Sequence, residues 1–359
     1  MVQFVAVRLL LRQKAIPFAP VSKPQIYLFF IAASLVWSCG NKRKVDVSHI
    51  PVNVKIERFD RDISALKNGD QAKAAELRKK YGVFYDDYME NILGVGNTQK
   101  PAYLSELQRV MSGAPWQDLL QSVDKTFPDL AKQETELTDA FRRIRYYFPQ
   151  RPLPKVYSFF SGFQVQTPVG NDYIGIGLDL FLGANAKYYP SLLQTFPHYV
   201  SRRFTPENIT PRVVEAVLRE DMFSETDAPA LLDKMIYNGK IMYLMDEFLP
   251  DTPDSLKIGY TAAQLEWCKN FEGKIWAYYL EENLLYNTDY QKIQKYLTDA
   301  PFTPGLGEGN SSAPKLAVWT GWQIVRKYME KHPDVTPAML MQLNNAQRIL
   351  QDAAYKPKP

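Results

Sequence analysis

One segment of the sequence carries residue types and a spacing that could do metal chemistry. Helices that hold a catalytic zinc ion often present two histidines four residues apart, with a glutamate after the first as general base. His198 stands at the first position, but Tyr199 replaces the glutamate and Arg202 replaces the second histidine. A third ligand often comes from a later helix, where the comparable position is Asn238. Because only one of three ligands is present, the sequence predicts that no metal is bound.

Two interpretations of His198 remain open. In the favoured one it is a hydrogen-bonded helix residue beside an apolar stripe, and the protein has no catalytic site. In the alternative, His198 works with Asp179, Glu215 or Glu220 as an atypical, metal-dependent hydrolase or peptidase site, since a carboxylate beside a histidine can move protons. Ordinary solvent-facing helix positions account for Glu215 and Glu220 more simply.

Other common catalytic motifs are missing from the sequence. There is no phosphate-binding loop and no Gly-x-Ser-x-Gly nucleophile elbow. The Gly-Ile-Gly at 175–177 lacks the third glycine of a dinucleotide site, and we expect its glycines to permit close strand packing. Three distant histidines and two cysteines exclude a histidine-rich or thiolate metal cluster, and Cys268 is expected in the core. The sequence therefore predicts no cofactor.

The first 38 residues have the composition of a secretory signal. They contain four basic and no acidic residues, and the apolar run at 26–37 is too short to span a bilayer, which takes about 20 residues. The run ends at Ser38-Cys39-Gly40, which resembles a bacterial lipobox. We therefore predict a signal peptide at 1–38, lipidation of Cys39, an anchored linker at 39–50 and a single domain at 51–359.

The formal charge of the chain changes meaning once this signal is removed. The full sequence carries 43 basic and 39 acidic residues, a net charge of +4. Without the four cations of the signal, 39 of each remain and the mature chain is neutral. Proteins that bind nucleic acid usually carry an excess of basic residues. The sequence thus predicts membrane contact through Cys39 and no nucleic-acid partner.

Apolar periodicity and turn residues predict a mostly helical α+β domain. The segments 155–160 and 173–178 are rich in β-formers and are separated by Gly and Pro, so we expect a small sheet or a hairpin around residues 155–180. Spacing near 3.6 residues predicts the helices. They are expected at 70–80, 105–111, 116–127, 135–148, 190–204, 210–218, 231–248, 261–285, 319–331 and 336–353.

Several short sequences together resemble the gliding motility lipoprotein GldB family of Bacteroidetes. They are DLFLG (179–183), YYP (188–190), LLDKMI (231–236), GYT (259–261), QLEWC (264–268), APFT (300–303) and GWQIV (321–325). That family in turn resembles predicted zinc-dependent proteases, so the resemblance implies a zincin-like, metallopeptidase-like fold. Since Tyr199, Arg202 and Asn238 replace required groups, it also implies a pseudoenzyme with vestigial metal-site positions at His198, Arg202 and Asn238.

The resemblance also implies where the protein works. Its family is part of the cell-envelope machinery of gliding and the associated secretion, so other proteins of that machinery are the expected partners. Surface export of such lipoproteins is usually signalled by acidic residues after the cysteine, and residues 40–44 contain none. We therefore expect a membrane-anchored lipoprotein that faces the periplasm.

Overall fold

The computed structural model describes residues 44–225, 227–307 and 311–358. The chain divides into two units after Val45, and the second comprises Asp46–Pro359. The predicted signal peptide and the predicted lipidation site, Cys39, lie outside the described residues. Within the part that is described, no helix is both long and apolar enough to cross a membrane. The second unit is mostly helical with one small sheet, which confirms the expected α+β class.

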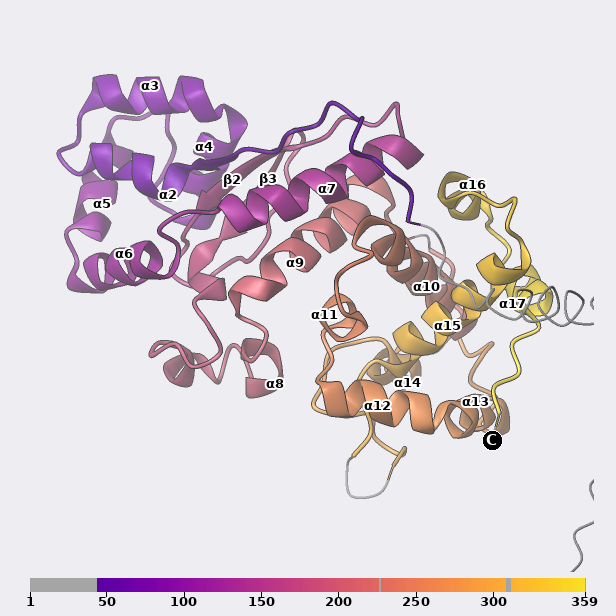
Figure 1. The fold of residues 1–359 in the computed structure, drawn as a ribbon. Helices are drawn as coiled ribbons and strands as arrows, with labels where there is room; N and C mark the ends of the chain where they lie inside the picture. Colours follow the sequence, from indigo (N-terminus) through magenta and orange to yellow (C-terminus); the bar gives the residue numbers. More distant parts are fainter. Residues whose placement is uncertain (1–43, 226, 308–310, 359) are drawn as a thin grey trace, which may run out of the picture. The chain divides into compact units, whose positions relative to one another are not determined.

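Three short parallel strands form the sheet (Figure 1). They are hydrogen-bonded in the order β1 (Ile56–Arg58), β2 (Lys155–Phe159) and β3 (Tyr173–Gly177). Val156 pairs with Ile56 on one side and with Ile174 on the other. The predicted small sheet is therefore confirmed, whereas a hairpin between β2 and β3 is wrong because these strands run in the same direction. The sequence did not predict β1.

The turn residues before β3 connect it to a short antiparallel neighbour, and not to β2 as a hairpin would require. Residues 166–169 run antiparallel beside β3, and the amide of Gly177 donates to the carbonyl of Gln166 at 2.8 Å. A Cβ atom on Gly177 would lie 2.4 Å from the carbonyl oxygen of Val165. The backbones are too close for a side chain there, which confirms that this glycine serves close packing.

The segment that leads into β1 is tied by hydrogen bonds to α7 (Ala131–Tyr147), along which it runs in Figure 1. The bonds are Val54 N–H to Thr138 Oγ1 at 2.9 Å, Ile56 N–H to Glu134 Oε1 at 3.0 Å, and Arg142 Nε–H to the Val52 carbonyl at 3.0 Å. Because β1 is an edge strand, side chains of α7 satisfy backbone groups that have no neighbouring strand on that side.

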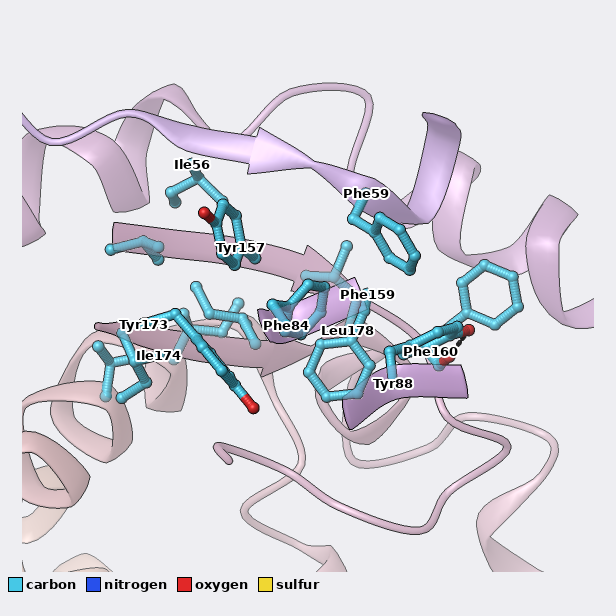
Figure 2. Packing of buried hydrophobic residues seen from close by; sticks show 14 of the residues in the cluster. Ile56, Phe59, Phe84, Tyr88, Tyr157, Phe159, Phe160, Tyr173, Ile174 and Leu178 are labelled. Atoms are coloured by element: carbon cyan, nitrogen blue, oxygen red, sulfur yellow. Dashed lines mark hydrogen bonds between the residues drawn. The ribbon is translucent and has the colours of Figure 1, made fainter. Parts of the chain in front are cut away.

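Aromatic side chains fill the core beside the sheet (Figure 2). Phe84 of α4 (Val83–Asp87) contacts Phe59, Tyr157 and Tyr173, with ring centroids 5.1, 4.9 and 5.0 Å apart. The Phe59 and Tyr173 contacts are edge-to-face, the geometry that the charge distribution of aromatic rings favours. The other helices of this half are α2 (Phe59–Asp62), α3 (Gln71–Tyr81), α5 (Ala102–Met111) and α6 (Ala114–Thr126).

The C-terminal half is built around two helices, α10 (Leu231–Phe248) and α15 (Leu316–Lys331). A Cβ atom on Gly239 would lie 2.2 Å from the carbonyl oxygen of Gly321, so the two backbones touch at this pair of glycines. Shorter helices complete this half: α8 (His198–Ser201), α9 (Ile209–Ala216), α11 (Asp254–Ile258), α12 (Ala262–Asn270), α13 (Glu272–Glu281), α14 (Tyr290–Ile293), α16 (Pro337–Gln342) and α17 (Ala346–Ala353).

Three of the expected helices are interrupted. The segment at 190–204 forms a 3₁₀ turn, Tyr189–Leu192, and the four-residue helix α8. The segment at 261–285 begins with a capping box between Thr261 and Gln264 but breaks at Phe271, between α12 and α13. The segment at 336–353 breaks between α16 and α17. Pro197 directly precedes α8, and Asn345 caps α17 by accepting from the amide of Arg348, so in two of these cases the sequence itself carries a signal for the interruption.

Candidate functional site

His198 and Arg202 lie one helical turn apart, as their spacing suggests. His198 begins α8 and is exposed, and the amide of Arg202 donates to its carbonyl at 3.0 Å. The side chain of Arg202 leads toward the start of α12, where Nη2 donates to the carbonyl of Gly259 at 2.8 Å and to Oε1 of Gln264 at 3.3 Å. A guanidinium fixed in this way acts as a structural link between two segments.

Asn238 lies elsewhere, in the middle of α10. It is buried, and its side-chain amide donates to the carbonyl of Lys234 on the same helix at 2.8 Å. Figure 1 shows α8 and α10 apart, with α11 between them in this view. Across the described residues, no three His, Cys, Asp or Glu side chains lie close enough together to hold a metal ion. The assignment of vestigial metal ligands to His198, Arg202 and Asn238 stays a prediction.

A partly buried ionic cluster joins the segment after α8, the helix α9 and the residue before α15, and we call it the cationic cluster. It consists of Arg203, Arg212, Glu215, Arg219, Asp299 and Lys315. In its first half, Glu215 on α9 pairs with Arg212 and, at 2.9 Å, with Nε of Arg219. Burial alone would raise the pKa of Glu215, but the charges of Arg212 and Arg219 outweigh burial and lower that pKa to about 2.

Asp299 holds the second half of the cationic cluster together. Its carboxylate lies 2.7 Å from Nη2 of Arg203 and 3.1 Å from Nζ of Lys315, the residue that precedes α15. Burial again opposes ionisation, yet the charges of Lys315 and Arg203 hold the pKa of Asp299 well below its usual value. The halves act on each other, since Lys315 also helps to lower the pKa of Glu215.

The cationic cluster has little capacity for acid–base or metal chemistry. Four cations surround two carboxylates, and this excess of positive charge repels a metal ion. Both carboxylates already accept bonds from arginine or lysine, so neither is a base that could take a proton near neutral pH. Glu220, the other carboxylate considered beside His198, is exposed at the surface.

Asp179 is fully buried just after β3 and closes the turn that follows β2. Its Oδ2 accepts from the amides of Ser161 at 3.1 Å and of Phe163 at 2.6 Å. Phe163 has a φ of +67°, a left-handed conformation that these bonds stabilise. Burial raises the pKa of Asp179 to about 6, although both amides pull that pKa down. The carboxyl group of Asp179 thus stabilises a turn, and this structural role accounts for its burial without a catalytic one.

The sequence offered only part of the signal needed to find the cationic cluster. Glu215 and Arg219 have the four-residue spacing of a helical ion pair, and this pattern could have been recognised. Asp299 and Lys315 carry no such signal because Asp299 meets Arg203 across 96 positions of the chain. Cys268 is fully buried, so its expected place in the core is confirmed.

Comparison with known proteins gives one match. A family model described as gliding motility protein GldB matches residues 40–357, nearly the whole of the chain after the predicted signal. No curated protein matches the sequence, and no solved structure matches it either.

Proposed function

The chain belongs to the gliding motility protein GldB family, and we propose that it is a lipid-anchored, non-catalytic component of the cell-envelope machinery for gliding and the associated secretion. The family match over residues 40–357 is the observation that carries the role in motility.

The proposed anchor is a lipid on Cys39, on the periplasmic side of the membrane. None of the helices in the described residues could serve as a membrane span. The short apolar run before Cys39 suits export and lipidation, and Lys42, Arg43 and Lys44 suit anionic lipid head groups. Membrane contact through acyl chains is therefore the simplest arrangement.

Replacing Cys39 tests the anchor directly. We expect Cys39→Ser to move the protein from the membrane fraction to the soluble fraction and to abolish fatty-acid labelling, while Cys268→Ser leaves both unchanged. Labelling that persists in Cys39→Ser would place the lipid elsewhere and overturn this part of the proposal.

The proposed absence of catalysis rests on the cationic cluster. Arginine and lysine hold both of its carboxylates, and cationic or amide side chains stand at two of the three sequence positions compared with zinc ligands. We propose that the domain descends from a metallopeptidase-like, zincin-like ancestor and now acts by binding partner proteins of the machinery.

Complementation separates this proposal from a hydrolase centred on His198. A strain without the gene should regain colony spreading and secretion when it receives His198→Ala at the wild-type protein level, because His198 is exposed and its loss does not disturb packing. Failure of His198→Ala, together with stoichiometric zinc in the wild-type protein that is lost in this variant, would favour the hydrolase. If deletion of the gene leaves both phenotypes intact, the role in motility and secretion is wrong.

A further inference from the structure

A cavity of about 390 Å³ lies between α10 and the connection from α16 to α17. Its volume is within the range of small-molecule sites in proteins. Most of its wall is apolar, with a few polar groups. The lining residues are Phe223, Ser224, Ala228, Asp233, Ile236, Tyr237, Lys240, Met341, Leu343, Asn344 and Ala346.

Lys240 is the unusual member of this wall. The residue is only 7% exposed, and its Nζ donates to the carbonyl of Leu343. No ion pair to Lys240 occurs in the described part of the chain, although a buried cation normally has a carboxylate partner. Burial, with no compensating charge, lowers the pKa of Lys240 to about 8.

Asp233, the acidic lining residue, does not act as that partner. It lies seven residues before Lys240 on the same helix, and neither it nor any other carboxylate in the described residues contributes to the pKa of Lys240. The segments that face α10 across the cavity contribute Ser224 and Asn344 as their polar lining residues. An ammonium has three N–H donors, so two remain on Lys240 after the bond to Leu343.

We propose that this cavity binds a small molecule with one carboxylate and an apolar body, and that the carboxylate pairs with Nζ of Lys240. A single negative charge would balance the single unpaired cation, and its oxygens would accept the two free N–H groups. Phe223, Ile236 and Met341 would contact the apolar body. A dianion such as phosphate would leave one buried charge without a partner, which is costly. This ligand site goes beyond the role proposed above and does not depend on it.

Matched probes test the proposal on the purified full-length protein. Octanoate and 3-phenylpropionate supply a carboxylate, and octanamide and 3-phenylpropionamide have the same shape without the charge. Titration followed by ligand-observed NMR or calorimetry should show saturable binding of both acids at millimolar concentration or below. We expect the amides to bind at least about tenfold more weakly, since the ion pair is lost.

Two variants locate the binding in this cavity. Lys240→Met keeps the length of the side chain and should remove the preference for acid over amide. Lys269→Met changes an exposed lysine on α12 and should bind both acids as the wild type does. A melting curve and a circular dichroism spectrum show whether Lys240→Met is folded.

Three results would overturn the proposal. They are no saturable binding of either acid to the wild type, amides that bind as tightly as the acids, and a folded Lys240→Met variant that retains the preference for acids. If Lys240→Met does not fold, the contrast between acid and amide is repeated with Lys240→Gln, which should show no preference for the acid.

Discussion

Two buried lysines, one on helix α10 and one on the neighbouring helix α11, lie in opposite electrostatic surroundings. Lys257 on α11 is 4% exposed and lies 2.8 Å from a carboxylate oxygen of Asp246 and 3.5 Å from one of Asp254. Lys240 is almost as buried, but the bond described for its ammonium goes to the backbone carbonyl of Leu343. The same side chain, at similar depth, is compensated in one place and uncompensated in the other.

The compensated lysine belongs to a closed network that joins α10, α11 and α15. Arg326 donates to Asp246 through Nε at 2.7 Å and to Asp254 through Nη1 at 2.9 Å. Its guanidinium carbon lies 3.8 Å from the ring centroid of Trp322, and Nε1 of Trp322 donates to Asp246 at 2.8 Å. Two cations face two carboxylates, so the network stabilises the helix packing without a residual charge.

The difference teaches how to separate structural from functional charge in this fold. A buried pair with matched partners has a structural explanation. A buried cation without a carboxylate costs stability, and such groups are often retained for binding or catalysis. Lys240 therefore stands out more clearly than His198, which is exposed and needs no special explanation.

The largest expected effect on stability comes from removing one carboxylate of the compensated network. Asp246→Ala removes the acceptor that Lys257, Arg326 and Trp322 share, and it leaves two cations facing the single carboxylate of Asp254. We expect a loss of about 3–5 kcal/mol in the free energy of unfolding, measured by urea denaturation. Glu76→Gln, in an exposed pair with Lys73, should leave the free energy of unfolding almost unchanged. Equal losses in both variants would show that the network contributes no more than a surface pair.

The next effect compares the two lysines directly. Lys257→Met leaves two buried carboxylates with one cation and should destabilise the protein by about 3 kcal/mol. Lys240→Met removes a charge without a carboxylate partner and should stabilise it by about 2 kcal/mol at pH 7. Changes of opposite sign in the free energy of unfolding, measured by urea denaturation at the same pH, would confirm that the two lysines differ in this way. If both variants are destabilised equally, Lys240 has an unrecognised stabilising role.

The smallest expected effect is a change with pH in the difference in stability between the wild type and Lys240→Met. Burial lowers the pKa of Lys240 from 10.5 to about 8 in the folded chain, so the unfolded chain binds more protons between these values. The wild type should therefore gain stability relative to Lys240→Met as the pH rises from 8 to 10.5. The measurement is urea denaturation of both proteins across that range.

Neighbouring groups and a control protein make the pH result interpretable. The titratable lining residues near Lys240 are Asp233 and Tyr237, and burial raises the pKa of Tyr237, which therefore keeps its proton over most of the range. Lys269→Met, at an exposed position, should show a constant difference from the wild type. A constant difference for Lys240→Met as well would mean that Lys240 titrates normally.

Features set by neighbouring residues were predictable from the sequence. The acidic start of α3 is a true cap, in which Asp70 accepts from the amides of Ala72 and Lys73. The capping box at Thr261 is also present. Both depend on groups two or three positions apart, within reach of any sequence pattern.

Features set by distant partners were not predictable. β1 is only three residues long, and it pairs with β2 about 100 positions further along the chain. The hairpin alternative was wrong because turn residues reveal where the chain reverses but not which strand becomes the neighbour. Lys240 meets Leu343 across 103 positions, so nothing near Lys240 in the sequence indicates the cavity.

The bonds between the entry segment and α7 also have a mechanical consequence. A pull on the N-terminal side of Asp46 would pass through residues 52–56, where the chain is bonded to α7 as it enters β1. Three hydrogen bonds to α7 would share the tension there, and a helix of 17 residues would spread it over the core. A tethered protein that transmits force between a membrane and a moving assembly would thus load a long helix together with its three-residue edge strand.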